Sequence, residues 1–130
     1  MAVEGPQMKL VGYTASADLS AKQFYFVKIS GDRTVTVCSA VTDIPIGVLQ
    51  NAPTSGQAAE VCVIGHTKVS SDGTLTRGTP IGTSSDGQAV TYAAGTDTTK
   101  YLVGQGLSST TTAGHIVEAY VNCASPTRGA

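Results

Sequence analysis

Apolar and polar residues alternate over short stretches along the whole chain, and no stretch of ten residues shows the 3.6-residue period of a helix. Such alternation over about four to eight residues predicts half-buried β-strands. A shorter strand is expected at Pro80, which fits only a sheet edge or a strand start because proline lacks a backbone donor. The pattern predicts an all-β fold, a small single-domain barrel or sandwich with little or no helix. The other predicted strands cover residues 9–13, 23–29, 34–38, 46–49, 60–69, 89–92, 101–107 and 115–122.

Turn residues separate these strands. The sequence SSDG occurs at 70–73 and again at 84–87, and Asp-Gly between apolar stretches predicts a hairpin because the tight turn needs positive φ. Residues 14–21 predict a loop or a single helical turn, and Gly65 indicates a bulge or bend in the longest strand. Loops are predicted at 51–57, 94–99 and 108–113. The predicted structural turn positions are Gly47, Gly56, Asp72, Gly73, Asp86, Gly87, Gly104 and Gly114.

One pattern occurs twice, at 44–63 and at 101–121. Each copy has an apolar strand with an early glycine, a polar loop that ends on glycine, and a second alternating strand. A solenoid needs about three or more units, so two copies predict two similar β halves packed on each other. The alignment places Gly47 on Gly104, Gly56 on Gly114, Glu60 on Glu118 and Val63 on Val121, and upstream it sets Gly31 opposite Gly87.

These features divide the chain into an N-terminal arm (1–8), a β domain (9–123) and a polar C-terminal tail (124–130). The internal repeat covers approximately 26–65 and 80–122 within the β domain. In the arm, Glu4-Gly5-Pro6 disfavours both helix and strand because proline fixes φ and removes a donor. The arm is therefore either a frayed terminus or a segment that orders against a partner.

Charge is scarce on this chain of 130 residues. Only 13% of the residues are charged, about half the usual share, so the surface is poorly protected against self-association and is typical of a subunit in an assembly. The net charge is −1 and the Lys and Arg residues are scattered, which argues against a nucleic-acid partner. No signal peptide and no apolar run of about 20 residues is present, so we expect synthesis in the cytoplasm and no membrane partner.

The residues that could perform chemistry form no recognisable site. Cys38, Cys62 and Cys123 are an odd set without a CxxC motif, which favours free, buried thiols, although a disulfide between two of them stays open. His66 and His115 have no third ligand at metal-binding spacing. The chain has no GxSxG motif, and Gly104-Gln105-Gly106 lacks the third glycine and the helix of a dinucleotide site. We therefore expect a non-enzymatic protein without catalytic residues, metal or cofactor.

Glu60 and Glu118 are the one pair of carboxylates with a structural relation, because the repeat makes them equivalent. A glycosidase would need them to face each other about 5–10 Å apart. Equivalent positions instead favour one local role performed twice, such as accepting hydrogen bonds from loop amides.

The order of these motifs resembles that of small bacteriophage head decoration, or capsid cement, proteins over about residues 10–122. The resemblance implies a non-enzymatic β-barrel-like or β-tulip-like subunit on the outside of an icosahedral head. Such subunits, often trimers, clamp neighbouring major capsid subunits against internal DNA pressure. The matching positions are Ile46-Gly47-Val48, Gly56, Val61, Val63, Pro80-Ile81-Gly82, Asp86-Gly87, Val103-Gly104, Leu107, Gly114 and Val121.

In several such proteins an N-terminal arm adds to the β structure of the capsid. The resemblance therefore implies a virion protein on the outer capsid surface whose partners are the major capsid protein and its own copies. A carbohydrate-binding or tail-associated β module and a small head-maturation hydrolase are the alternatives; a sugar platform could use Tyr13, Tyr92, Tyr101 or Tyr120. The implied capsid-binding residues are Ala2, Val3, Glu4, Pro6 and Met8, with Val3, Pro6 and Met8 as apolar anchors.

Overall fold

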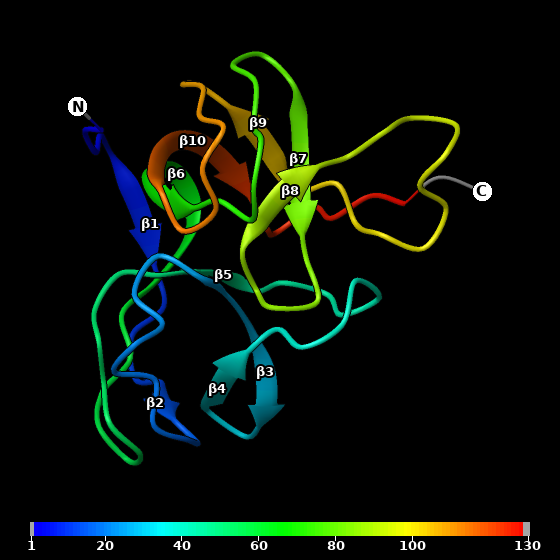
Figure 1. Cartoon of the computed structure of the whole chain (residues 1–130). Coiled ribbons are helices and arrows are strands. Elements are labelled where there is room, and N and C mark those ends of the chain that lie inside the picture. The colour runs from blue at the N-terminus through cyan, green and yellow to red at the C-terminus, as the bar shows by residue number, and fades with distance from the viewer. Residues whose placement is uncertain (1, 129–130) are drawn as a thin grey trace.

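The structure is a computed structural model that describes residues 2–128. Residue 1 of the predicted arm and residues 129–130 of the predicted tail lie outside this range. The described residues form ten strands and no helix, which confirms the all-β prediction (Figure 1). The strands are β1 (Gln7–Lys9), β2 (Thr14–Ala15), β3 (Phe26–Gly31), β4 (Thr34–Val37), β5 (Gly47–Leu49), β6 (Val61–Ser70), β7 (Pro80–Thr83), β8 (Ala89–Thr91), β9 (Gly104–Gly106) and β10 (Ile116–Asn122).

The hydrogen-bonded strand order makes the internal repeat visible. The order is β2-β4-β3-β5-β6-β10-β9-β7-β8, and β1 pairs with β6 outside this path. Four strands of the first half, β4-β3-β5-β6, meet four strands of the second half in reverse order, β10-β9-β7-β8. The chain is therefore built from two similar β halves that join where β6 pairs with β10.

The strand registers of the two halves also correspond. Val48 of β5 pairs with Cys62 of β6. The equivalent residues of the second half, Gln105 of β9 and Tyr120 of β10, also pair with each other. The first glycine of each copy, Gly47 or Gly104, lies so close to the backbone of the neighbouring strand that no side chain fits. A Cβ atom on Gly47 would meet the carbonyl oxygen of Cys62, and one on Gly104 would meet that of Tyr120.

The upstream alignment of Gly31 with Gly87 is wrong. Val27 faces Gly47 whereas Ile81 faces Gly104, so β3 and β7 correspond at Val27 and Ile81. Gly31 then lies at the end of β3, whereas Gly87 lies in the loop between β7 and β8. The two hairpins are equally long, because Ile29 faces Val35 and Thr83 faces Ala89, each pair six residues apart. Gly87 therefore corresponds to Arg33, and both have a positive φ, 83° and 57°.

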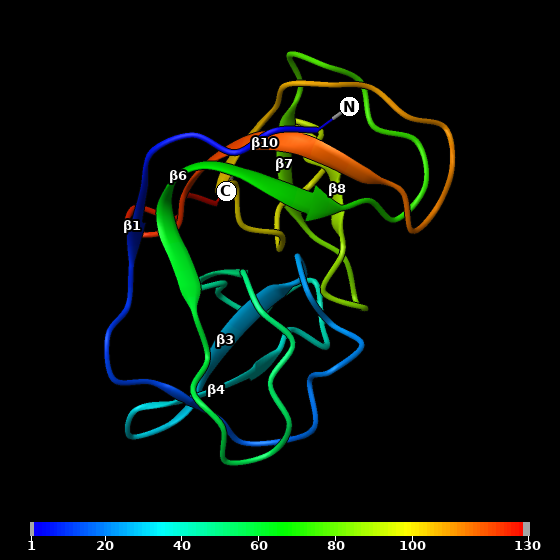
Figure 2. The ribbon, with the colours of Figure 1, turned by 90° about the vertical axis from the view of Figure 1, so that its left-hand side faces the viewer.

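Strand β6 belongs to both halves (Figure 2). Its first residues pair with β5, and from Ile64 onward it bends to run beside β10. Gly65 has a φ of 147°, a conformation that L-residues with a side chain rarely adopt, so the predicted bend is present at this position.

Each half curls into a small barrel-like body. An isolated bridge between Thr14 and Ala58 joins the first half to the segment before β6, and a bridge between Ser71 and Ala89 joins the second half to the segment after β6. One apolar cluster fills the first half, with Ala15, Leu19, Val27, Val35, Leu49, Ala59 and Val61. A larger cluster fills the second half and the junction, with Phe26, Cys38, Val48, Cys62, Val63, Val69, Leu75, Ile81, Ala89, Val103, Val117, Ala119, Val121 and Cys123.

Three local predictions are corrected. The strand expected at 9–13 is interrupted after Lys9, because Gly12 has a φ of 80°, and pairing resumes in β2, where a loop or helical turn was expected. The hairpin expected at 70–73 is absent, since β6 and β7 are not neighbours, although Gly73 does have a positive φ of 102°. The second SSDG sequence does join paired strands, β7 and β8.

The loop glycines are equivalent in the two halves, and the polar tail returns to the domain. Gly56 and Gly114, the second pair of aligned glycines, have nearly equal φ values of 84° and 81°, and neither has a neighbouring atom within 4 Å of a Cβ position. Residues assigned to the tail return to the domain, because Leu102 and Thr127 form an antiparallel bridge.

Candidate functional site

The N-terminal segment is attached to the middle of β6. Strand β1 pairs antiparallel with β6, with Met8 opposite Ile64. Before the strand, the Gly5 N–H donates to the His66 carbonyl at 3.0 Å, and the His66 N–H donates to the Pro6 carbonyl at 3.1 Å. Glu4, Gly5 and Pro6 lie outside any strand, as the sequence predicts, whereas Gln7 and Met8 of the predicted arm belong to β1. Pro6 needs no partner for its nitrogen, and its carbonyl still accepts a ladder-like hydrogen bond.

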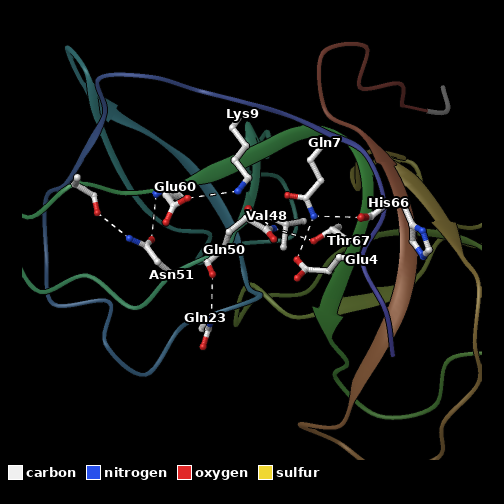
Figure 3. Close-up of polar contacts among 11 residues, drawn as sticks. Glu4, Gln7, Lys9, Gln23, Val48, Gln50, Asn51, Glu60, His66 and Thr67 are labelled. Atoms are coloured by element: carbon white, nitrogen blue, oxygen red, sulfur yellow. Dashed lines mark hydrogen bonds and ion pairs between the residues drawn. The ribbon is translucent and has the colours of Figure 1, made fainter. Parts of the chain in front are cut away.

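The absence of a side chain at Gly65 lets the segment approach β6. A Cβ atom on Gly65 would meet the Pro6 carbonyl oxygen and the Gln7 Cα atom. Figure 3 shows the Gln7 amide between Glu4 and the backbone of His66, with both hydrogen bonds at 3.1 Å. Gly65 therefore fixes both the bend of β6 and the path of the N-terminal segment.

The apolar side chains of the N-terminal segment point to solvent. Val3 is 48% exposed and Met8 is 61% exposed, and Pro6 and Glu4 are exposed as well, whereas Ala2 is half-buried. Among the described strands, β1 pairs only with β6, so its outer edge offers unpaired backbone groups. The implied contact residues thus lie along the segment whose backbone is attached to β6 at Gly5, Pro6 and β1.

A second exposed feature crosses the outer face of the second half. Pro80, Gln105, Tyr120 and His66 face one another in register across β7, β9, β10 and β6. Tyr120 is 56% exposed and is the one aromatic side chain among the large exposed apolar residues of the described part of the chain. Sequence reasoning did not single out this row. The alternation in β10, where Val117, Ala119 and Val121 are buried, is the signal that places Tyr120 on the opposite face.

The two aligned glutamates do not share a side-chain role. Glu60 forms an exposed ion pair with Lys9 at 3.4 Å, whereas Glu118 contacts the Nε2 atom of His66 at 2.9 Å. What the repeat preserves is a backbone contact. The Glu60 N–H donates to the Asn51 side chain at 3.0 Å, and the Glu118 N–H donates to the equivalent Ser108 hydroxyl at 2.9 Å. The prediction of one shared role is therefore wrong for the carboxylates.

The three cysteines are free and buried, as the sequence predicts. Burial raises the pKa of the Cys38 thiol to about 12 and that of the Cys62 thiol to about 11. The pKa of Cys123 is also raised, again chiefly by burial. A nucleophilic cysteine needs a lowered pKa and access to solvent, so these thiols are suited to packing.

The two histidines serve local contacts. His66 pairs with Glu118, and the Nδ1 atom of His115 lies 2.9 Å from the Thr110 hydroxyl. Within residues 2–128, no three or more His, Cys, Asp or Glu side chains gather closely enough to hold a metal ion. The same residues contain no helix long and apolar enough to cross a membrane.

The sequence matches no protein-family model and no curated protein. Its fold does match a solved structure, the crystal structure of the head fiber gp8.5 N base in bacteriophage phi29. The TM-score is 0.65 with 17% sequence identity, and the match covers 89% of this chain and 96% of that chain. The two chains share a fold. The shared region includes most of both β halves, because only about a tenth of this chain lies outside the match.

Proposed function

We propose that this chain is a structural subunit of a phage head, bound to the outer surface of the shell, where it cements neighbouring major capsid subunits. The observation that carries the proposal is the fold shared with a phage head fiber base over nearly the whole length of both chains. The motif order that resembles head decoration proteins supports the same assignment. The protein would act by binding alone, without catalysis.

The N-terminal segment is the contact that this function would use. Strand β1 holds its backbone on β6, while Val3, Pro6 and Met8 project apolar surface outward. An extended capsid segment could pair with the open edge of β1 and cover these side chains, since edge pairing gives affinity without charged residues. This mode suits a chain of which only 13% is charged.

The resemblance also supports a trimer at the head surface, with synthesis in the host cytoplasm before attachment. Free protein in solution can be tested for a trimer by light scattering at several concentrations. A monomer at all concentrations would restrict any trimer to the head-bound state.

Co-sedimentation tests the central proposal. Purified protein is mixed with expanded, decoration-free heads of the cognate capsid protein, and separately with unassembled capsid protein. We expect saturable binding to heads and little binding to free subunits, because the site would span subunits. An absence of binding to heads would overturn the proposal.

The contact is tested by Met8→Asp. Met8 is 61% exposed and its backbone pairs with Ile64, so the variant should fold while its binding to heads falls at least about tenfold. Val11→Asp is the matched control, because Val11 is 85% exposed just after β1 but lies outside the predicted contact. Equal binding of both variants would keep the head-binding role and move the contact away from β1.

A further inference from the structure

We propose that a shallow cleft beside Tyr120, on the outer face of the second half, binds a neutral saccharide. The cleft lies where the returning tail passes β9 and β10, because Leu102 and Thr127 pair by backbone hydrogen bonds in both directions. Its lining residues are Leu102, Val103, Gly104, Gln105, Tyr120, Val121, Asn122, Ser125 and Thr127.

Tyr120 supplies the apolar platform. Its neighbours in β10, Ala119 and Val121, are buried in the core, so the strand holds Tyr120 firmly while this residue is 56% exposed. An aromatic ring presents a flat apolar face with a polar hydroxyl at one end. The C–H face of a pyranose ring is complementary to such a surface, and its hydroxyls can reach polar groups at the rim.

Polar groups surround that ring on fixed positions. Gln105 lies directly opposite Tyr120, and its Nε2 atom donates to the Gly78 carbonyl at 3.1 Å, which orients the amide and leaves its oxygen to accept. Asn122 is exposed two residues along the same face of β10 and offers a second amide. Ser125 and Thr127 add hydroxyls from the tail. Amides and hydroxyls can both donate to and accept from sugar hydroxyls.

The charge of the lining decides the ligand class. None of the nine lining residues is Lys, Arg, His, Asp or Glu, so the cleft offers no counterion to a phosphate or a carboxylate. An anion would lose hydration there without a counterion to replace it, whereas a neutral polyol exchanges one set of hydrogen bonds for another. This arrangement is typical of a ligand site, which combines an apolar surface with a few polar groups at fixed positions.

The cleft is distinct from the N-terminal contact. Neither Val3 nor Met8 belongs to its lining, and β1 pairs with β6 on its own. The saccharide site therefore does not depend on the proposed head-binding role. Loss of one activity can be measured while the other is retained.

The experiment is a titration of the isotope-labelled protein with neutral trisaccharides, monitored by amide NMR. The probes are maltotriose, cellotriose and triacetylchitotriose, with a sulfated trisaccharide as the anionic comparison. We expect saturable shifts at Gln105, Tyr120 and Asn122 with at least one neutral probe and none with the anionic probe. An absence of shifts with all three neutral probes would overturn the proposal.

Variants test the platform. Tyr120→Ala should weaken binding at least about tenfold, whereas Tyr120→Phe keeps the ring and should stay within about threefold. Ile29→Ala is the matched control, because Ile29 is an exposed apolar residue on β3 in the other half. Thermal unfolding of each variant checks folding. Unchanged saccharide binding by Tyr120→Ala would overturn the proposal. The proposal would also fall if the natural protein self-associates with increasing concentration and Tyr120→Ala abolishes this, because the cleft would then bind a second copy of the chain.

Discussion

The two halves of the molecule place equivalent residues in opposite surroundings. Cys62 and Val48 of the first half correspond to Tyr120 and Gln105 of the second, in the same strand register. Phe26 corresponds to Pro80 in the next strand. The three residues of the first half are fully buried, whereas their three counterparts are exposed.

The difference arises from what lies against each sheet. The turn at 84–88 reaches from the second half to the first, where the Phe26 N–H donates to the Gly87 carbonyl at 2.7 Å. A Cβ atom on Gly87 would contact the Val37 side chain and backbone oxygens of the first half. The equivalent turn at 30–34 contacts the first half itself, where the Thr14 N–H donates to the Arg33 carbonyl at 3.0 Å. Repetition therefore fixes the backbone ladder, while contact with the other half decides which face is covered. Phe26, Val48 and Cys62 pack in one cluster with second-half residues such as Val103 and Cys123.

Exchanging the residues of one equivalent pair should give the largest contrast. Cys62→Tyr forces a large ring into a fully buried position, and we expect a loss of about 3 kcal/mol or more in the free energy of unfolding. Tyr120→Cys should change that free energy by no more than about 0.5 kcal/mol, because Tyr120 is exposed. Urea denaturation of both variants measures the contrast. Similar losses would show that the two faces are covered alike.

Replacing the early glycines tests the shared backbone instead. Gly47→Ala and Gly104→Ala each direct a Cβ atom into a backbone carbonyl of the neighbouring strand. We expect both to lower the free energy of unfolding by about 2–3 kcal/mol, since backbone atoms cannot move aside as a side chain can. Chemical denaturation of the two variants side by side provides the comparison. A loss in only one half would contradict the equivalence of the ladders.

The loop glycines should show a smaller and again equal effect. Gly56→Ala and Gly114→Ala meet no neighbouring atom, so only the positive φ opposes the substitution. The expected loss is about 1 kcal/mol for each, measured by thermal unfolding. Unequal losses would indicate that the two loops are held differently.

The smallest expected effect concerns acid stability. Partial burial alone would raise the pKa of Asp43, but hydrogen bonds from Lys28 and from the Ser39 and Ala40 N–H groups together hold it below 3.8. In the corresponding loop of the second half, the Ala93 N–H chiefly lowers the pKa of Asp97, and Lys100 adds to the effect. A carboxyl with a lowered folded-state pKa stabilises the fold above its unfolded pKa, and this stability is lost as the pH falls through the folded value.

Asp43→Asn and Asp97→Asn should therefore flatten the decline of stability below about pH 4. Denaturant titrations at pH 7, 4 and 3 compare each variant with the natural protein. An unchanged decline in either variant would show that its carboxylate does not contribute to acid sensitivity.

Much of the fold was predictable because the strands are amphipathic and their glycines are placed by local needs. The alternation in 60–69 and 115–122 predicts the two longest strands, β6 and β10, to within one residue at each boundary. The short strands were less accessible, since β2 contains only two residues and its pairing with β4 is parallel and distant in sequence. The implied contact residues of the N-terminal segment were named from the resemblance, but not their attachment to β6.

The sequence by itself determined the all-β class, the twofold repetition, the burial of the three thiols and the exceptional backbone at Gly65. These properties depend on residue type and on near neighbours in the chain. Only the tertiary structure decided that β1 adds to β6, that SSDG forms a hairpin at one of its two sites, and that Tyr120 is exposed where Cys62 is buried. Each of these depends on which distant segment lies alongside, and local alternation carries no information about that neighbour.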